Sequence, residues 1–247
     1  MRSFSASVQA REPSLRAPPF DVLSPLESAR IAAAARVRSV ARRERLYGQG
    51  DRAEHAFVVL RGAVLLCAGT EDGRTLGFDL LGEAETFGLV PFLDDGPRAE
   101  EAVAIEDGMV AAVPYRALAA QTERRAPFAL ALARFAAAEA RRARGHALEL
   151  AAGTVSRRLA EVVLRLAGRF GVGSREGVVI DVGIVQQDLA ALVGVSRETL
   201  NRHLSALSSA GSLGRRRRGY VVRDTAALER EAGGPWHQWP VAPPTGA

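Results

Sequence analysis

The segment from Ile184 to Leu207 constrains the fold more than any other part of this chain. It runs IVQQDLAALVGVSRETLNRHLSAL. We expect a first helix over 186–193, and Gly194 is the residue most able to take the positive φ of a tight turn between helices. Ser196 is a favourable N-cap for a second helix. Leucines at i, i+4 and i+7 of that helix should pack inward on one face: Leu200, Leu204 and Leu207.

The other face of the second helix carries polar side chains that match the edges of DNA bases. These are Arg197, Glu198, Asn201, Arg202 and Ser205. Arginine can pair with both acceptors of guanine, and glutamate can accept from the amino group of cytosine. The Ser196 hydroxyl and the amides of Gln186 and Gln187 could bind phosphates and set the register.

Four consecutive arginines follow the two helices. Arg215–Arg218 precede the β-type run Gly219–Arg223, which favours a hairpin, or wing, whose Arg216 and Arg217 contact the DNA backbone. Each charged residue taken alone could simply belong to a solvated surface. The turn glycine, the cap, the inward leucines and the basic hairpin occur together, and they predict binding of double-stranded DNA.

Charge is distributed unevenly along the chain. From 184 to 224 there are seven arginines and three acids, whereas from 50 to 110 there are four arginines and thirteen acids. The net charge of +5 therefore combines an acidic N-terminal half with a basic C-terminal module. A polyanion should be attracted to the second and repelled by the first.

The rest of the chain divides by composition into an α+β arrangement. A short helix is expected from Leu26 to about Val37, after the start signal Ser24-Pro25. Short β-type runs separated by turns, from about 46 to 113, predict an antiparallel sandwich or barrel. From 115 to 170 an Ala, Leu, Arg and Glu composition favours helix. The expected parts are a mobile tail at 1–19, a sensor domain at 20–122, a dimerisation helix at 123–153, a winged helix-turn-helix at 154–231 and a second tail at 232–247.

The predicted dimerisation helix contains a stripe of small residues in alternating steps of four and three. Its members are Ala129, Ala133, Ala136, Ala140, Ala143, Ala147, Leu150 and Thr154. This heptad spacing favours a seam between two copies of the chain, and so a homodimer. The alternative is an Ala-rich helix that packs on its own barrel.

Several function classes are not expected. No apolar run is long enough to span a membrane, and the N-terminus has no apolar signal region, so the cytoplasm is the expected location. Cys67 is the only cysteine and His55 the only histidine of the β-region, which argues against a metal site. We therefore expect no cofactor. The rival hypothesis of a barrel enzyme with a basic tail lacks a metal cluster, a Gly-rich phosphate loop and a nucleophile–base pair.

The chain resembles the CRP/FNR family of transcription regulators over nearly its whole length. The matching pieces are Leu46–Asp51, Ala56–Gly62, Phe87-Gly88 with Leu93–Arg98, Arg158–Ala160 and Gly194–Arg202. The resemblance implies a cyclic-nucleotide-binding-like barrel, a long dimerising helix and a winged helix-turn-helix that acts with RNA polymerase. It also implies that Arg197, Glu198 and Arg202 read a TGTGA-like half-site, where Asn201 replaces a family glycine.

The sensor pocket departs from the cyclic-nucleotide pattern of that family. Leu89 replaces the family's ribose-binding Glu, and Ala99 replaces the Ser beside the phosphate-binding Arg98. The carboxylates of Glu100 and Glu101 follow directly and oppose an anion. The helix positions that supply purine-binding hydroxyls fall on Ala143 and Arg144. We therefore expect no cyclic-nucleotide binding, an internal ion pair for Arg98 and an effector of another kind; a cyclic-nucleotide-responsive regulator is the rival.

Overall fold

The computed structural model describes residues 15–71 and 73–234. The predicted tails therefore lie largely outside the described residues, at 1–14 and 235–247. Two stretches are exceptions. On the C-terminal side, Ala232 is the last residue of a helix and only 7 % exposed, so the predicted start of the second tail at 232 was wrong. On the N-terminal side are residues 15–19, where Leu15 and Ala17 are each only 1 % exposed. They share an apolar core with Phe20, Phe128 and Leu132, so the prediction that the mobile tail extends to residue 19 was wrong.

The N-terminal part consists of two four-stranded antiparallel sheets with an apolar core between them. The first has the order β1 (Arg36–Val40), β8 (Gly108–Pro114), β3 (His55–Arg61) and β6 (Thr86–Phe87). The second has the order β2 (Arg45–Tyr47), β7 (Glu101–Ala104), β4 (Val64–Gly69) and β5 (Thr75–Leu81). Side chains of both sheets fill the space between them, among them Val59, Leu66, Phe87 and Val110. The predicted α+β class is confirmed, with the barrel built as two sheets.

The first helix is shorter than the sequence predicted. A short 3₁₀ turn, η1 (Phe20–Val22), precedes α1 (Pro25–Ala34). The start signal acts as a capping box: the Ser24 amide donates to Glu27 Oε2 at 2.8 Å, and the Glu27 amide donates to Ser24 Oγ at 3.4 Å. The expected extension to Val37 was wrong. Arg36–Val40 instead pairs with β8 as an edge strand, because the backbone becomes extended at Ala35.

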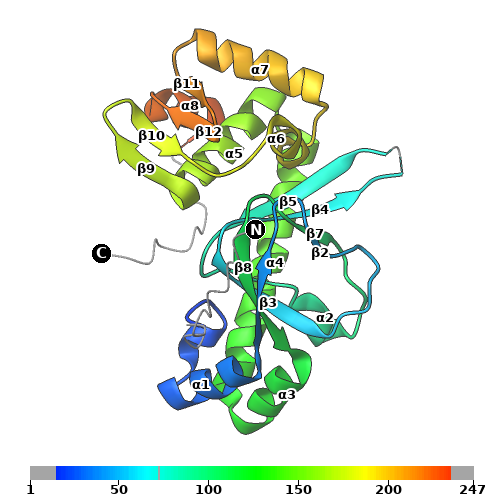
Figure 1. Cartoon of the computed structure of the whole chain (residues 1–247). Helices are drawn as coiled ribbons and strands as arrows, with labels where there is room; N and C mark the ends of the chain where they lie inside the picture. Colours follow the sequence, from blue (N-terminus) through cyan, green and yellow to red (C-terminus); the bar gives the residue numbers. More distant parts are fainter. Residues whose placement is uncertain (1–14, 72, 235–247) are drawn as a thin grey trace, which may run out of the picture.

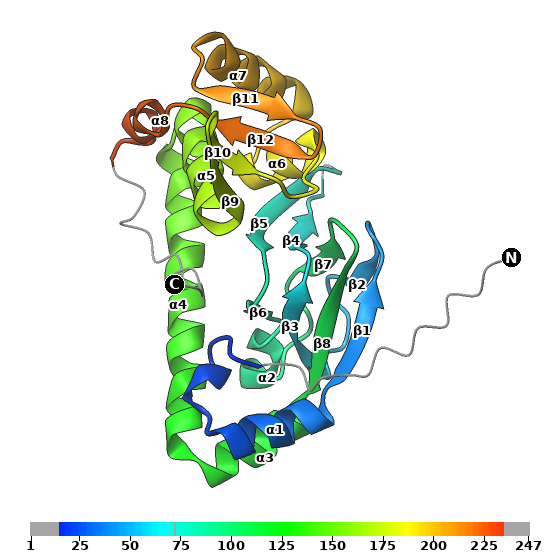
Figure 2. The same cartoon turned by 60° about the vertical axis from the view of Figure 1, so that its left-hand side comes forward.

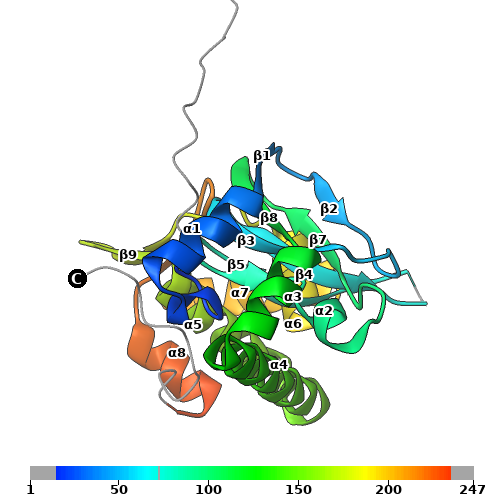
Figure 3. The ribbon, with the colours of Figure 1, turned by 90° about the horizontal axis from the view of Figure 1, so that it is seen from below.

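The helical region divides into three helices. They are α3 (Tyr115–Arg124), α4 (Ala126–Ala152) and α5 (Val155–Phe170), while the short α2 (Val90–Asp94) lies within the β-domain. Figure 2 shows α4 running beside the two sheets, from α3 at one end of the molecule to the C-terminal domain at the other. From below, α1 and α3 lie across the end of the sheets (Figure 3).

The C-terminal domain is a winged helix built on α5. It contains β9 (Gly171–Ser174), β10 (Gly177–Ile180), α6 (Gln186–Val193), α7 (Arg197–Ser209), β11 (Leu213–Arg216), β12 (Gly219–Val222) and α8 (Thr225–Ala232). The four strands form one sheet in the order β11-β12-β10-β9 (Figure 1). The predicted range of the first helix and the predicted start of the second helix after Ser196 are confirmed.

The winged helix packs directly on the β-domain. Cys67, Leu80 and Ile105 of the β-domain share one apolar cluster with Leu189 and Leu192 of α6. The contact is close, since a Cβ added at Gly77 of β5 would lie 2.9 Å from the Leu192 nitrogen. Among the described residues, no helix is long and apolar enough to cross a membrane, and no three His, Cys, Asp or Glu side chains form a metal cluster.

Candidate DNA-binding site

The geometry of the α6–α7 turn follows from a few local residues. Gly194 ends α6 with φ +70°, a left-handed conformation that glycine adopts without steric cost. Ser196 caps α7, and its side chain accepts from the Thr199 amide at 3.2 Å. Leu200 and Leu204 are buried, and Leu207 is partly buried against the same core. The inward face predicted for α7 is therefore confirmed.

The opposite face of α7 is open to solvent at its N-terminal end. Arg197, Glu198 and Arg202 are exposed, and Asn201 is half-buried. A hydrogen bond from its own backbone amide lowers the pKa of Glu198, so this side chain is a carboxylate at neutral pH. The base-contact candidates therefore lie together on one accessible turn and a half of helix.

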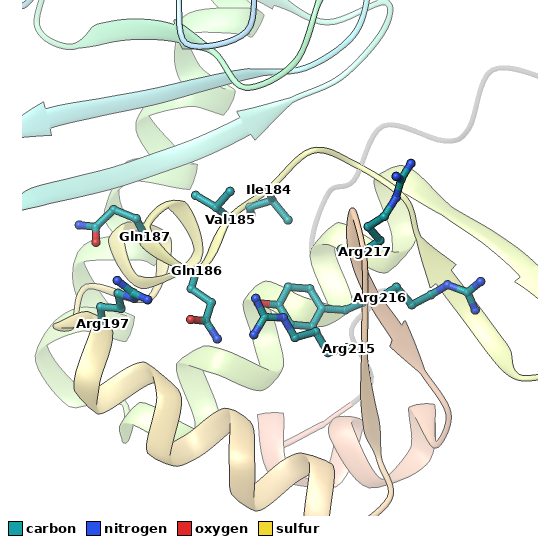
Figure 4. A pocket seen from close by; sticks show the side chains of 10 residues that line it. Ile184, Val185, Gln186, Gln187, Arg197, Arg215, Arg216 and Arg217 are labelled. Carbon is teal, nitrogen blue, oxygen red and sulfur yellow. The ribbon is translucent and has the colours of Figure 1, made fainter.

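A cleft of about 320 Å³ separates the start of α6 from the wing. It is lined by Ile184, Val185, Gln186, Gln187, Arg197, Arg215, Arg216, Arg217, Gly219 and Tyr220. Figure 4 shows Gln186 and Arg197 on one side and Arg215 on the other, while Arg216 points away from Gln186. The structure thus brings the predicted phosphate-binding glutamines and wing arginines to one positively charged cleft beside α7.

The wing is a tight hairpin whose arginines differ in their partners. Arg215 and Arg216 of β11 pair in register with Tyr220 and Gly219 of β12. Arg216 forms an ion pair with Glu176 at 3.0 Å. Arg218 forms one with Glu106 of the β-domain at 2.7 Å. These exposed pairs hold their arginines weakly, so a phosphate could displace either carboxylate.

Two polar contacts that hold the site together have no counterpart in the sequence analysis. Arg43 of the β-domain pairs with Asp188 in the first turn of α6. Ser156 Oγ lies 2.9 Å from His203 Nδ1, which joins α5 to α7. No local sequence pattern could have indicated either contact, because the partners come from separate elements.

Arg98, the arginine predicted to lie in the effector pocket, is bound by the protein itself. Arg98 is 3 % exposed and donates from Nη2 to the His55 carbonyl at 2.6 Å and from Nη1 to the Gly88 carbonyl at 3.0 Å. Its guanidinium carbon lies 4.0 Å from the centre of the Tyr47 ring. The predicted ion pair was wrong: backbone carbonyls and an aromatic ring hold Arg98. Glu100 instead accepts from the Tyr47 hydroxyl at 3.0 Å.

The neighbouring pocket candidates have separate environments. Leu89 is 1 % exposed in the core beneath α1 and α4, whereas Ala99 is exposed. Cys67 is buried, as expected of a core residue, and burial raises the pKa of its thiol to about 12. A thiol with such a pKa is unreactive at neutral pH.

Comparison with known proteins assigns the two domains. Residues 37–125 match the cyclic nucleotide-binding domain family, and residues 157–231 match the Crp-like helix-turn-helix domain family. The chain is 35 % identical to the cyclic AMP receptor protein of Thermus thermophilus over 195 residues, covering 76 % of this chain and 84 % of that one. It is 32 % identical over 214 residues to the nitrogen fixation regulation protein FixK of Azorhizobium caulinodans, covering 83 % of this chain and 84 % of that one.

Solved structures agree with the sequence comparisons. The structure of FixK2 from Bradyrhizobium japonicum superposes with a TM-score of 0.71 at 27 % identity, covering 84 % of this chain and 98 % of that chain. A transcriptional regulator of the CRP family from Thermus thermophilus superposes with a TM-score of 0.66 at 26 % identity, covering 80 % of this chain and 97 % of that chain. With a sensor-type β-domain, a long helix and a winged helix-turn-helix in the same order as these relatives, the chain belongs to the CRP/FNR family of transcription regulators.

Proposed function

We propose that this protein is a non-enzymatic, sequence-specific regulator of transcription initiation that binds an inverted-repeat operator as a homodimer. The observation that carries the proposal is the accessible face of α7 beside the basic cleft. Arg197, Glu198 and Arg202 face solvent together, and the lining of the cleft supplies further cationic groups. Base-edge donors next to phosphate-binding groups are what a duplex requires. RNA polymerase is the protein partner that such a role implies.

A free face of α4 supports the homodimer. Of the predicted seam, Ala133, Ala140, Ala143, Ala147 and Thr154 are exposed, whereas Ala129, Ala136 and Leu150 are half-buried. Two large apolar side chains of α4 are also open to solvent beside the seam positions: Leu130, next to Ala129, is 50 % exposed, and Leu148, next to Ala147, is 68 % exposed. A second copy of α4 packed along the seam would come close to Leu130, and the seam alanines would permit close approach of the two helices.

We further propose that the sensor domain does not bind cyclic nucleotides, although one relative is named a cyclic AMP receptor protein. Both terminal nitrogens of Arg98 are engaged by backbone carbonyls, so a cyclic phosphate would have to displace them. The ribose position is occupied by the buried Leu89, which cannot accept a hydrogen bond.

Selection of binding sites from random DNA tests the proposed function. Wild type should yield a symmetric inverted repeat with half-site centres about one helical turn, or roughly 34 Å, apart. The variant Arg202→Ala should lose preference at one base pair of each half-site, at a cost of about 1–3 kcal/mol. Ser208→Ala, an exposed change near the end of α7 and outside the predicted base-contact face, serves as the control. A wild-type sequence logo without symmetry would refute the dimer, and an unchanged Arg202→Ala logo would refute base contact by Arg202.

A further inference from the structure

Arg158 lies in the first turn of α5, directly after the break that separates α4 from the winged helix. Gly153 and Thr154 form this break, and both have extended backbone, with ψ of 140° and 158°. The orientation of the winged helix relative to α4 depends on these two residues and on the contacts that span them. Arg158 provides such a contact.

The Arg158 guanidinium binds the ends of two different helices. Its Nη1 donates to the Gly153 carbonyl at the end of α4, at 2.7 Å. Its Nε donates to the carbonyl of Val193, the last residue of α6, at 2.9 Å. The last carbonyls of a helix lack intrahelical partners and carry partial negative charge. A planar, permanently charged fork can satisfy both at once, which a lysine ammonium on a flexible stem cannot do with the same rigidity.

A second contact joins the same two parts of the molecule. Gly194, the turn residue between α6 and α7, lies so close to α4 that a Cβ there would be 2.6 Å from Leu150 Cδ2. The helix-turn-helix turn therefore rests on the last turn of α4. Arg158 and Leu150 together connect the predicted dimerisation helix to the residues that immediately precede α7.

We propose that Arg158 is a positioning residue that fixes the direction of α7 relative to α4, and through it the half-site spacing that the dimer accepts. This rests on the proposed function, because spacing has meaning only for a dimer on two half-sites. Adding one base pair between half-sites moves them apart by about 3.4 Å and rotates one against the other by about 35°. A rigid connection between α4 and α7 tolerates one spacing, and a loose connection tolerates several.

The test measures affinity for operators whose half-sites are fixed and whose spacer is changed by one base pair in either direction. Wild type should lose at least about tenfold for each change. Arg158→Met should bind the optimal spacer about tenfold more weakly and discriminate less than about threefold between spacers. Its affinity for a single half-site should stay within about twofold of wild type, since the base-reading face is untouched. Arg158→Lys, which can keep one of the two bonds, should be intermediate.

Arg157→Met is the matched control. Its side chain is adjacent, 50 % exposed and paired only with Glu161 of its own helix among the described residues, so spacer preference should be unchanged. An equal loss on every spacer and on the single half-site would overturn the inference, because Arg158 would then only support the fold of the domain. If Arg158→Met fails to fold, the spacer preference of Arg158→Lys is the test of the inference. A spacer preference equal to that of wild type in Arg158→Lys would then overturn it. Failure of the proposed function is distinct: wild type itself would show no spacer preference.

Discussion

The carboxylate of Asp188 accepts hydrogen bonds from both terminal nitrogens of Arg43, at 2.7 and 2.8 Å, across 145 positions of sequence. The Asp188 side chain is 5 % exposed and also accepts from the Val185 amide at 3.1 Å. Arg43 has φ +68°, which is uncommon outside glycine. Its hydrogen bond to Asp188 raises the pKa of the guanidinium. The pair attaches the first turn of α6 to the loop between β1 and β2.

Removal of Arg43 should destabilise the protein by leaving a buried carboxylate without its partner. We expect Arg43→Met to lower the free energy of unfolding by about 1–3 kcal/mol, less than for a fully buried pair because Arg43 is 42 % exposed. A double-mutant cycle with Asp188→Asn, followed by urea unfolding, isolates the pair. Arg52→Met, at a side chain that is 90 % exposed, should change little. Additive effects of the two substitutions would show that they do not interact.

The wing arginines should contribute to affinity without regard to sequence. Replacing Arg216 and Arg217 with Gln should weaken binding to all operators alike and reduce the slope of log affinity against log salt by about two units. The reason is that each arginine releases a condensed counterion when it meets a phosphate. Fluorescence anisotropy at several salt concentrations measures the slope, with Arg61→Gln at the end of β3 as the control. Loss of preference at one base position would contradict the assignment to the wing.

The dimer should depend on the small residues of α4. Ala140 and Ala147 are exposed in a single copy, and replacement of both with Glu should yield monomers, because like charges would meet across the seam. Light scattering gives the mass in solution. Ala152→Glu, exposed on α4 but away from the seam, should leave a dimer. A dimer that persists in the double variant would place the interface elsewhere.

Cyclic nucleotides should not be tight ligands. Isothermal calorimetry with cyclic AMP and cyclic GMP should give no micromolar isotherm, because Arg98 is already bound by the carbonyls of Gly88 and His55. The same contacts make Arg98 structural: Arg98→Met should lower the free energy of unfolding by about 1–3 kcal/mol, because the His55 carbonyl loses the Arg98 donor and the Gly88 carbonyl keeps only the Tyr115 hydroxyl. A clear micromolar isotherm for either nucleotide would show that the site is functional.

Glu85 should make stability depend on pH. Burial raises the pKa of this carboxyl from 4.5 to about 7, against the opposing effect of Arg169 at 3.0 Å. Between pH 4.5 and 7 the folded state keeps a proton that the unfolded state has released, so stability should fall as pH rises through this window. Urea midpoints at pH 5 and pH 8 should differ more in wild type than in Glu85→Gln. Glu83→Gln, at an exposed site, should retain the wild-type difference between the two urea midpoints. If this difference is equal in wild type, Glu85→Gln and Glu83→Gln, the role of Glu85 is refuted.

Local sequence determined the elements of the DNA-binding module. The turn at Gly194, the cap at Ser196 and the inward leucines of α7 depend on backbone preference and helical periodicity within a dozen residues, so the sequence predicted them correctly. The proposed departure of the effector site at Leu89 and Ala99 rests on comparison with the family's pattern and stays a prediction. The end of α1 could not be predicted from local sequence, because the extended strand at Arg36–Val40 is stabilised by pairing with β8, which lies more than sixty residues away.

Contacts between elements were decided only by the tertiary structure. The sequence indicated that Arg98 needs a partner, but it suggested a nearby acid, whereas the fold brings two backbone carbonyls to the guanidinium. Backbone acceptors occur at every residue and leave no mark in the sequence. Arg43 with Asp188, and Arg158 with Val193, are also set by how separate elements pack. Composition and periodicity specify which face of an element is apolar, while the distance between two polar atoms is fixed only when those faces come together.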